Sequence, residues 1–225
     1  GLAKGATVMS WQGMKGGIKA AKLKHQVVMS PTTYAYLDYS QGDHSVENWI
    51  YAKLSLEKTY EFEPVPEGID SKYIMGGQAN VWTEVIPTLQ FAFYMTYPRA
   101  FSISETLWSP KEKKNWNNFI TKTEIHFQRF DDSKTNISKA IYEPVVRMYK
   151  KDGKLYCELT NSIPNSEIFY TIDNTYPVNY GLKYKGAFEV PNGELSLRTQ
   201  TFRNNTALGR ELIIPREELL KRANR

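Results

Sequence analysis

The 225-residue sequence is poor in the residues that cross-link small domains or bind metals. It has one cysteine, Cys157, so no intrachain disulfide can form. Its three histidines, His25, His44 and His126, are far apart and fit no metal-ligand motif. A disulfide-bonded scaffold is therefore excluded, a metal centre is disfavoured, and we expect no cofactor.

Long apolar runs and clustered charge are absent as well. No stretch reaches the roughly 18 apolar residues of a membrane helix, and the opening GLAKGATVMS lacks the segments of a signal peptide. It reads as if the chain were entered in the middle of a domain. The net charge is +5, but the densest basic run, at 15–24, has the spacing of a solvated helix face. We expect neither a membrane span nor a nucleic-acid partner.

Several catalytic motifs are also missing. The glycines at 13, 16 and 17 form no dinucleotide-binding pattern, and there is no G-x-S-x-G nucleophile motif. Cys157 falls in a predicted strand, which is typical of a packed thiol. Hydrophobic residues make up 41% of the chain, so we expect a folded core.

The first 140 residues have the pattern of a parallel α/β unit. Short apolar runs predict strands at 6–11, 26–31 and 73–84. Longer amphipathic or apolar stretches between and after them predict helices at 16–25, at 88–108 with a break at Pro98, and at 115–130. The alternation of strand and helix favours a parallel sheet.

Residues 141–225 have a different pattern, which predicts a small antiparallel β-sandwich. Short, partly alternating runs lie between turn signals such as Asp152-Gly153. The predicted strands are at 154–161, 167–173, 182–190, 194–202 and 210–215. The last ten residues are highly charged and predict a frayed tail helix.

Aromatic and acidic side chains follow the predicted strands of the first part. Trp11 ends the first strand, Tyr36 and Asp38 follow the second, and Trp82 and Glu84 end the third. In a parallel α/β barrel the carboxyl ends of the strands carry the active site. Aromatic rings suit the C–H face of a sugar, and carboxylates accept hydrogen bonds from its hydroxyls. By pattern alone, however, these tryptophans are equally consistent with core residues, and the carboxylates with helix or turn caps.

Four segments then resemble a known family. MSWQG, YLDY, GGQANVWTE and YPRAFSISETLWSP, in this order, are similar to the second half of the catalytic (β/α)8 TIM barrel of family-20 glycoside hydrolases, the β-N-acetylhexosaminidases. EIFYTIDNTYP and the runs after it resemble the small C-terminal β domain of bacterial members. The resemblance implies a secreted or periplasmic parent enzyme that removes terminal N-acetylglucosamine or N-acetylgalactosamine from glycans.

The resemblance also implies a role for each candidate residue. In this family the substrate's acetamido oxygen attacks the anomeric carbon, with an enzyme Glu as general acid and base. Trp11 resembles the Trp that lines the acetamido pocket, and Tyr36 the Tyr that holds the acetamido oxygen. Asp38 and Glu84 resemble the carboxylates that bind sugar hydroxyls. Trp82 resembles the Trp on which the sugar ring packs.

The sequence departs from the family pattern at the catalytic pair. The family's adjacent Asp-Glu lies on the fourth barrel strand, whereas this chain resembles the barrel from the fifth strand onward. The substrate-binding Arg of the first strand is missing too, and Arg99 reads as structural. We therefore expect the chain to be inactive alone. We also expect the missing N-terminal half-barrel, or self-association, to cover an open strand edge.

Two alternatives remain open at this stage. Asp38 and Glu84 could be the acid and nucleophile of a different barrel glycosidase. Alternatively, the chain could be a non-catalytic carbohydrate-binding or interaction module, with the β domain as its active part. Four tyrosines leave room for that second reading: Tyr170, Tyr176, Tyr180 and Tyr184.

Overall fold

The computed structural model describes residues 1–48 and 50–224, which divide into two compact units. The first comprises Gly1–Gln41 and Trp49–Ser138, and the second comprises Gly42–Asn48 and Lys139–Arg225. The segment 42–48 thus groups with the second unit, although it interrupts the sequence of the first. The two units are described separately below.

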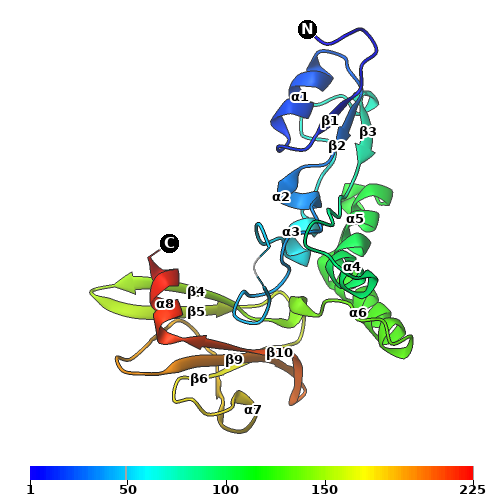
Figure 1. Cartoon of the computed structure of the whole chain (residues 1–225). Coiled ribbons are helices and arrows are strands. Elements are labelled where there is room, and N and C mark those ends of the chain that lie inside the picture. The colour runs from blue at the N-terminus through cyan, green and yellow to red at the C-terminus, as the bar shows by residue number, and fades with distance from the viewer. Residues whose placement is uncertain (49, 225) are drawn as a thin grey trace. The chain divides into compact units, whose positions relative to one another are not determined.

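A parallel sheet forms the centre of the first unit, as the sequence predicted. Strands β1 (Val8–Ser10), β2 (Val27–Met29) and β3 (Ile74–Gly77) are parallel and lie in the order β1-β2-β3 (Figure 1). The described residues of this unit also form the α-helices α1 (Lys15–Lys22), α2 (Thr32–Ala35), α3 (Leu56–Tyr60), α4 (Leu89–Thr96), α5 (Arg99–Trp108) and α6 (Trp116–Asp132), and the short 3-10 helices at Ser71–Tyr73 and Lys111–Lys113. Pro98 separates α4 from α5, at the predicted break.

Helix α1 packs closely on the sheet because Gly17 has no side chain. A Cβ atom at this position would lie 2.7 Å from Met29 Sδ and 2.9 Å from Ser10 Cβ, closer than packed atoms approach. The Ser10 hydroxyl also accepts a hydrogen bond from the Gly17 amide at 2.8 Å. The core beside this contact consists of small and apolar residues: Ala20, Ala21, Val27, Met29, Ala35, Phe62 and Ile103.

Glycine is favoured at each of the last two positions of β3, for a different physical reason. Gly76 has φ of +135°, a conformation that favours glycine, where the register with β2 shifts. Gly77 has no room for a side chain, since a Cβ there would lie 2.7 Å from Leu107 and 2.8 Å from Phe62. Asn80, Trp82 and Glu84 follow these two glycines in the chain.

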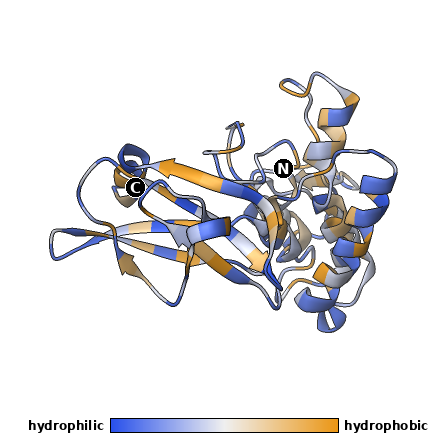
Figure 2. Cartoon of the chain, turned by 90° about the horizontal axis from the view of Figure 1, so that it is seen from below, coloured by the Kyte–Doolittle hydropathy of each residue, from blue (hydrophilic) through white to orange (hydrophobic). Residues whose placement is uncertain are grey.

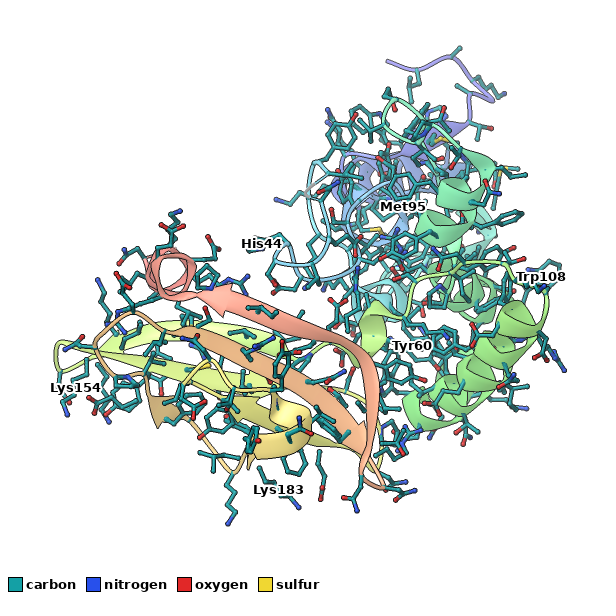
Figure 3. The ribbon with its side chains drawn as sticks, turned by 60° about the horizontal axis from the view of Figure 1, so that its bottom comes forward. His44, Tyr60, Met95, Trp108, Lys154 and Lys183 are labelled. Carbon is teal, nitrogen blue, oxygen red and sulfur yellow. The ribbon has the colours of Figure 1, made fainter. Side chains whose placement is uncertain are left out.

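The second unit is built from two antiparallel sheets, in agreement with the predicted fold class. One sheet has the order β10-β9-β6-β7 and the other β4-β5-β8. Apolar residues from both sheets pack together, including Met148, Leu155 and Cys157 from one and Ile168, Leu197 and Leu212 from the other. Hydrophobic and hydrophilic positions are interspersed along these strands (Figure 2), and Lys154 and Lys183 point outward (Figure 3).

The strand bounds in this unit are β4 (Val145–Lys151), β5 (Lys154–Thr160), β6 (Glu167–Thr171), β7 (Leu182–Lys183), β8 (Phe188–Glu189), β9 (Ser196–Arg203) and β10 (Thr206–Pro215). A short helix, α7 (Pro177–Tyr180), precedes β7. Strand β4 was not predicted, because its charged residues conceal the alternation of its buried positions.

The predicted tail helix is present, but the prediction that it is frayed was wrong. Helix α8 (Arg216–Ala223) buries Leu219 completely in the core of the second unit. Its Arg222 donates two hydrogen bonds to the carboxylate of Asp43, at 2.7 and 2.8 Å. Burial and ion pairing therefore hold this end of the chain, and its high charge does not indicate fraying.

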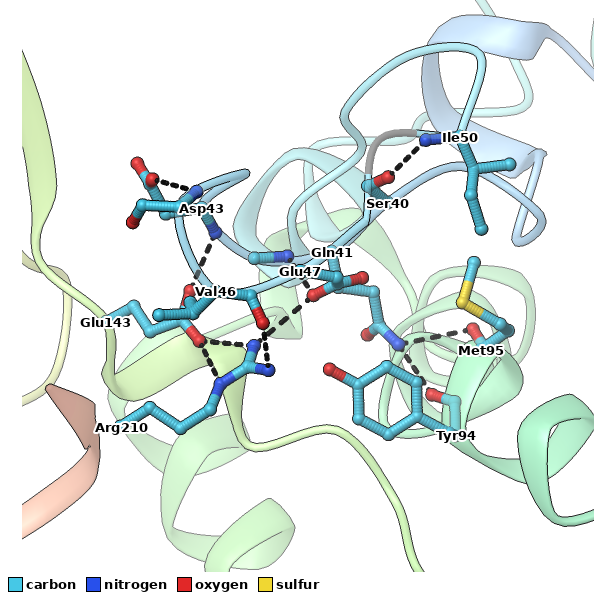
Figure 4. A network of polar contacts seen from close by, with 12 residues as sticks. Ser40, Gln41, Asp43, Val46, Glu47, Ile50, Tyr94, Met95, Glu143 and Arg210 are labelled. Carbon is cyan, nitrogen blue, oxygen red and sulfur yellow. Dashed lines mark hydrogen bonds and ion pairs between the residues drawn. The ribbon is translucent and has the colours of Figure 1, made fainter. Parts of the chain in front are cut away.

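Segment 42–48 belongs to the second unit through a buried polar network (Figure 4). The Asp43 amide donates to Glu143 at 2.7 Å, and Arg210 donates to the same carboxylate at 2.8 Å. Burial alone would raise the pKa of Asp43, but the bonds from Arg222 outweigh it and hold the pKa well below its usual range. None of the described helices is long and apolar enough to cross a membrane.

Candidate active site

Parallel pairing continues beyond β2 and β3 and brings the predicted site residues together. Tyr36 and Asn80 form an isolated parallel bridge. The Leu37 amide donates to the Asn80 carbonyl at 2.7 Å, and the Asn80 amide donates to the Ala35 carbonyl at 2.8 Å. The residues that follow, Asp38 on one segment and Trp82 on the other, therefore lie side by side.

The end of β1 is tied to the same edge of the sheet. The Thr32 amide donates to the Trp11 carbonyl at 2.9 Å, so the residue after β1 is fixed beside the start of α2. Trp11 keeps 48% of its surface exposed, and Trp82 keeps 50%. Both rings therefore remain open to a ligand. They are not core residues, which was the alternative that the sequence left open.

One cavity of about 680 Å³ joins all five predicted residues. It is lined by Met9, Trp11, Thr32, Tyr36, Asp38, Tyr39, Tyr51, Gln78, Asn80, Trp82 and Glu84. This volume is within the range of pockets for small ligands. The structure thus places Trp11, Tyr36, Asp38, Trp82 and Glu84 at one site, while their individual roles remain predictions.

Aromatic rings form one continuous wall of the cavity. The Tyr36 ring lies 6.4 Å from that of Trp82 and 5.8 Å from that of Tyr39, between centroids. Tyr39 in turn lies 6.4 Å from Tyr51. All three pairs are tilted by about 50°, a geometry that aromatic quadrupoles favour over face-to-face stacking. The wall presents apolar ring faces beside the polar groups of the site.

Asp38 is the most deeply buried carboxylate of the cavity, with 2% of its surface exposed. Burial raises its pKa above the usual value, the Glu84 charge adds to this, and hydrogen bonds from the backbone of Asp38 and Trp82 oppose it. The positive charge of Arg99 also lowers the pKa. One carboxylate oxygen, Oδ1, is buried without a hydrogen-bond partner. Such an oxygen is ready to accept a bond from a ligand hydroxyl.

Two amide side chains of the cavity were missed from the sequence. Gln78 Nε2 donates to Asn80 Oδ1 at 2.7 Å, and Asn80 Nδ2 donates to Ser30 Oγ at 2.7 Å. Gln78 and Asn80 continue the every-second-residue spacing of Trp82 and Glu84, so the period of a strand could have found them. Tyr51, with φ of +51°, had no such signal, because it reaches the cavity from a distant loop.

Two other kinds of site can be considered in the described residues, a metal centre and a nucleophilic cysteine. Among residues 1–48 and 50–224, no group of three His, Cys, Asp or Glu side chains could hold a metal ion. Cys157 is fully buried in β5, and burial raises the pKa of its thiol to about 12. A thiol with such a pKa is protonated at neutral pH and is a poor nucleophile.

A parallel α/β unit with its cavity at the carboxyl ends of its strands has the arrangement of TIM-barrel enzymes. Residues 1–111 match the catalytic domain of glycosyl hydrolase family 20, and residues 157–210 match the Fn3-associated domain. The chain belongs to glycosyl hydrolase family 20: it contains part of the catalytic domain, followed by an Fn3-associated domain.

Its relatives are longer proteins. The chain is 34% identical over 210 residues to a beta-hexosaminidase of Porphyromonas gingivalis, covering 89% of this chain and 27% of that protein. It is 35% identical over 131 residues to a beta-hexosaminidase of Akkermansia muciniphila, covering 55% of this chain and 26% of that one. The chain thus spans about a quarter of the length of these curated relatives.

The fold is also similar to a solved structure. The exo beta-N-acetylglucosaminidase of Vibrio harveyi, solved in complex with N-acetylglucosamine, superposes with a TM-score of 0.52 and 27% identity. The similarity covers 60% of this chain and 22% of that one.

The raised pKa of Asp38 predicts that its ionised carboxylate lowers the stability of the first unit at neutral pH. A carboxyl with a raised folded-state pKa stabilises the fold below its unfolded pKa, about 3.9, and loses that contribution as the pH rises through the folded value. Asp38→Asn is therefore expected to increase the free energy of unfolding of the first unit at pH 7 and to leave it unchanged at pH 3. Urea unfolding followed by tryptophan fluorescence measures this, since Trp11, Trp82, Trp108 and Trp116 all lie in the first unit. A less stable variant at pH 7 would contradict the account.

Proposed function

We propose that this chain supplies the sugar-binding part of a β-N-acetylhexosaminidase that acts on terminal N-acetylglucosamine or N-acetylgalactosamine of glycans. One observation carries the proposal: the five residues that match the family's sugar-binding positions line a single cavity. The similarity to a protein solved with N-acetylglucosamine supports the same class of ligand.

The chemistry of the cavity fits an N-acetylated sugar. The sugar ring packs on Trp82, and its hydroxyls donate to Asp38 and Glu84. Trp11 encloses the acetamido group, and the Tyr36 hydroxyl holds its oxygen. Charge-assisted hydrogen bonds of this kind contribute about 1.5–3 kcal/mol each. Confining the acetamido group makes its attack on the anomeric carbon effectively intramolecular, as substrate-assisted retaining catalysis requires.

The general acid of this reaction is proposed to come from outside these 225 residues. The sequence contains no Asp-Glu dipeptide. Glu84 cannot easily replace it, because in the proposed binding mode its carboxylate accepts bonds from sugar hydroxyls. We therefore propose that the chain binds the sugar but does not hydrolyse glycosides alone.

The sheet of the first unit is proposed to need a partner. In the described residues, β1 and β3 each pair with β2 alone, so each has an unpaired edge. Exposed edges with apolar neighbours such as Met9 and Met75 favour association. The partner is proposed to be an N-terminal half-barrel or, in its absence, a second copy of the chain.

Binding of N-acetylglucosamine tests the site directly. Trp82→Ala is expected to abolish measurable binding in calorimetry, because it removes the surface on which the sugar ring packs. Glu84→Gln is expected to weaken binding by about 10- to 150-fold, the loss of one charge-assisted bond. The matched control is Trp108→Ala. Trp108 is 87% exposed, points away from the packed interior and lies outside the cavity (Figure 3), so affinity should be unchanged.

The alternative that the second unit binds carbohydrate depends on exposed tyrosines. Tyr170 and Tyr184 are partly buried against the core of the second unit, and only Tyr176 and Tyr180 are largely exposed. The same calorimetry separates the two readings. Replacing Tyr176 and Tyr180 by alanine should leave affinity for N-acetylglucosamine unchanged if the cavity of the first unit is the binding site.

The alternative of a glycosidase that uses Asp38 and Glu84 is favoured by one observation, the raised pKa of Asp38, which is a property of general acids. A chromogenic N-acetylglucosaminide distinguishes it. Our proposal predicts no release of chromophore above buffer by the 225-residue chain at any pH between 4 and 8. Turnover that Glu84→Gln abolishes would overturn the proposal and support the alternative.

A further inference from the structure

Arg99 is completely buried in the first unit and is surrounded by backbone carbonyls. It is the first residue of α5. Its Nη1 donates to the carbonyls of Tyr39 at 2.9 Å and Leu54 at 3.0 Å. Its Nη2 donates to the carbonyls of Leu37 and Met95, both at 2.6 Å. Four acceptors from three separate segments thus share one guanidinium.

Two of these carbonyls flank the carboxylate of the cavity. Leu37 and Tyr39 are the residues immediately before and after Asp38. The bond to the Leu37 carbonyl fixes the peptide unit that enters Asp38, and the bond to the Tyr39 carbonyl fixes the unit between Tyr39 and Ser40. When both neighbours face the guanidinium, the backbone of 37–39 has little freedom to rotate. The Asp38 carboxylate is then held toward the cavity and the Trp82 amide, which donates to it.

The other two carbonyls anchor this arrangement to the helices. Met95 lies in the last turn of α4, where unsatisfied carbonyls and the helix dipole favour a cation. Leu54 precedes α3. A rigid planar fork with five N–H donors suits four carbonyls at fixed positions, whereas a lysine ammonium has three donors on a flexible chain.

Arg99 also supplies the positive charge that acts on the cavity. Of the described residues that line the cavity, none is a lysine or arginine, and Glu84 is the other carboxylate. Tyr36, Tyr39 and Tyr51 are the remaining titratable groups that line the cavity. Burial and the charge of Glu84 raise the pKa of Asp38, and the positive charge of Arg99 lowers it. A carboxylate must be ionised to accept hydroxyl bonds at full strength.

We propose that Arg99 is a positioning residue of the sugar pocket, which holds the backbone on both sides of Asp38 and provides the buried counter-charge for its carboxylate. This inference rests on the proposed function. It assigns a role in sugar affinity to a residue that does not line the cavity and that the sequence alone presents as structural.

The test compares two losses of hydrogen bonds near the same helix end. Gln41 Nε2 donates to the carbonyls of Tyr94 at 2.6 Å and Met95 at 3.4 Å (Figure 4). Gln41 is neutral and does not bond to the neighbours of Asp38 in these contacts. Gln41→Ala therefore removes comparable anchoring of α4 and is the matched control for Arg99→Lys, which keeps the charge but cannot reproduce the fork.

Affinity for N-acetylglucosamine is measured by calorimetry with the whole 225-residue chain, next to thermal unfolding of each variant. We expect Arg99→Lys to lose at least tenfold in affinity at pH 7. Gln41→Ala is expected to bind within twofold of the wild type. This difference in affinity should remain even if the two variants unfold at the same temperature. Equal affinity of wild type and folded Arg99→Lys overturns the proposal. If Arg99→Lys does not fold, Arg99 acts on folding alone, and the proposal is likewise overturned.

The second readout needs no ligand. Titration of the Asp38 carboxyl carbon by NMR is expected to give a higher midpoint in Arg99→Met than in wild type, and an unchanged midpoint in Gln41→Ala. An unchanged midpoint in folded Arg99→Met overturns the counter-charge. If Arg99→Met does not fold, the affinity of Arg99→Lys decides. A wild type that does not bind N-acetylglucosamine, with the shift in midpoint still present, contradicts the proposed function but retains the role of Arg99 toward Asp38.

Discussion

The candidate site depends on one buried cation. Arg99 donates hydrogen bonds to backbone carbonyls in the segment after β2, just before α3 and in the last turn of α4. A buried guanidinium is stable only when its donors are satisfied and a counter-charge is near. The four carbonyls bond both Nη atoms of Arg99, and the Asp38 carboxylate contributes a counter-charge. The geometry of the pocket and the stability of the first unit are therefore coupled through the same side chain.

The cavity combines groups that a folded core would avoid. A carboxylate with a partnerless buried oxygen and two half-exposed tryptophans are costly in the empty state. Both features become favourable when a sugar supplies hydroxyl donors and an apolar ring face. Local violations of this kind are characteristic of binding sites, where the ligand completes the interactions. The second unit shows the opposite arrangement, in which buried charges such as Asp43 and Arg222 are paired within the protein.

The sequence predicted the parallel sheet and the antiparallel second domain from strand period and strand order. The same pattern drew attention to the five residues that share the cavity, but only the resemblance to family 20 favoured a sugar site over core or capping roles. The sequence could not predict the role of Arg99, since the four carbonyls that it bonds come from residues 37, 39, 54 and 95. It also misjudged α8, where a high density of charge concealed the buried Leu219 and the pairing of Arg222 with Asp43. In both cases the deciding partner is distant in sequence, and local patterns carry no information about it.

The most direct test of the central claim is a crystal structure of the 225-residue chain with N-acetylglucosamine. The account predicts the sugar ring against Trp82, its hydroxyls within hydrogen-bond distance of Asp38 Oδ1 and Glu84, and the acetamido group between Trp11 and Tyr36. A sugar bound with its acetamido group toward Asp38 and Glu84, or bound outside this cavity, would contradict the account.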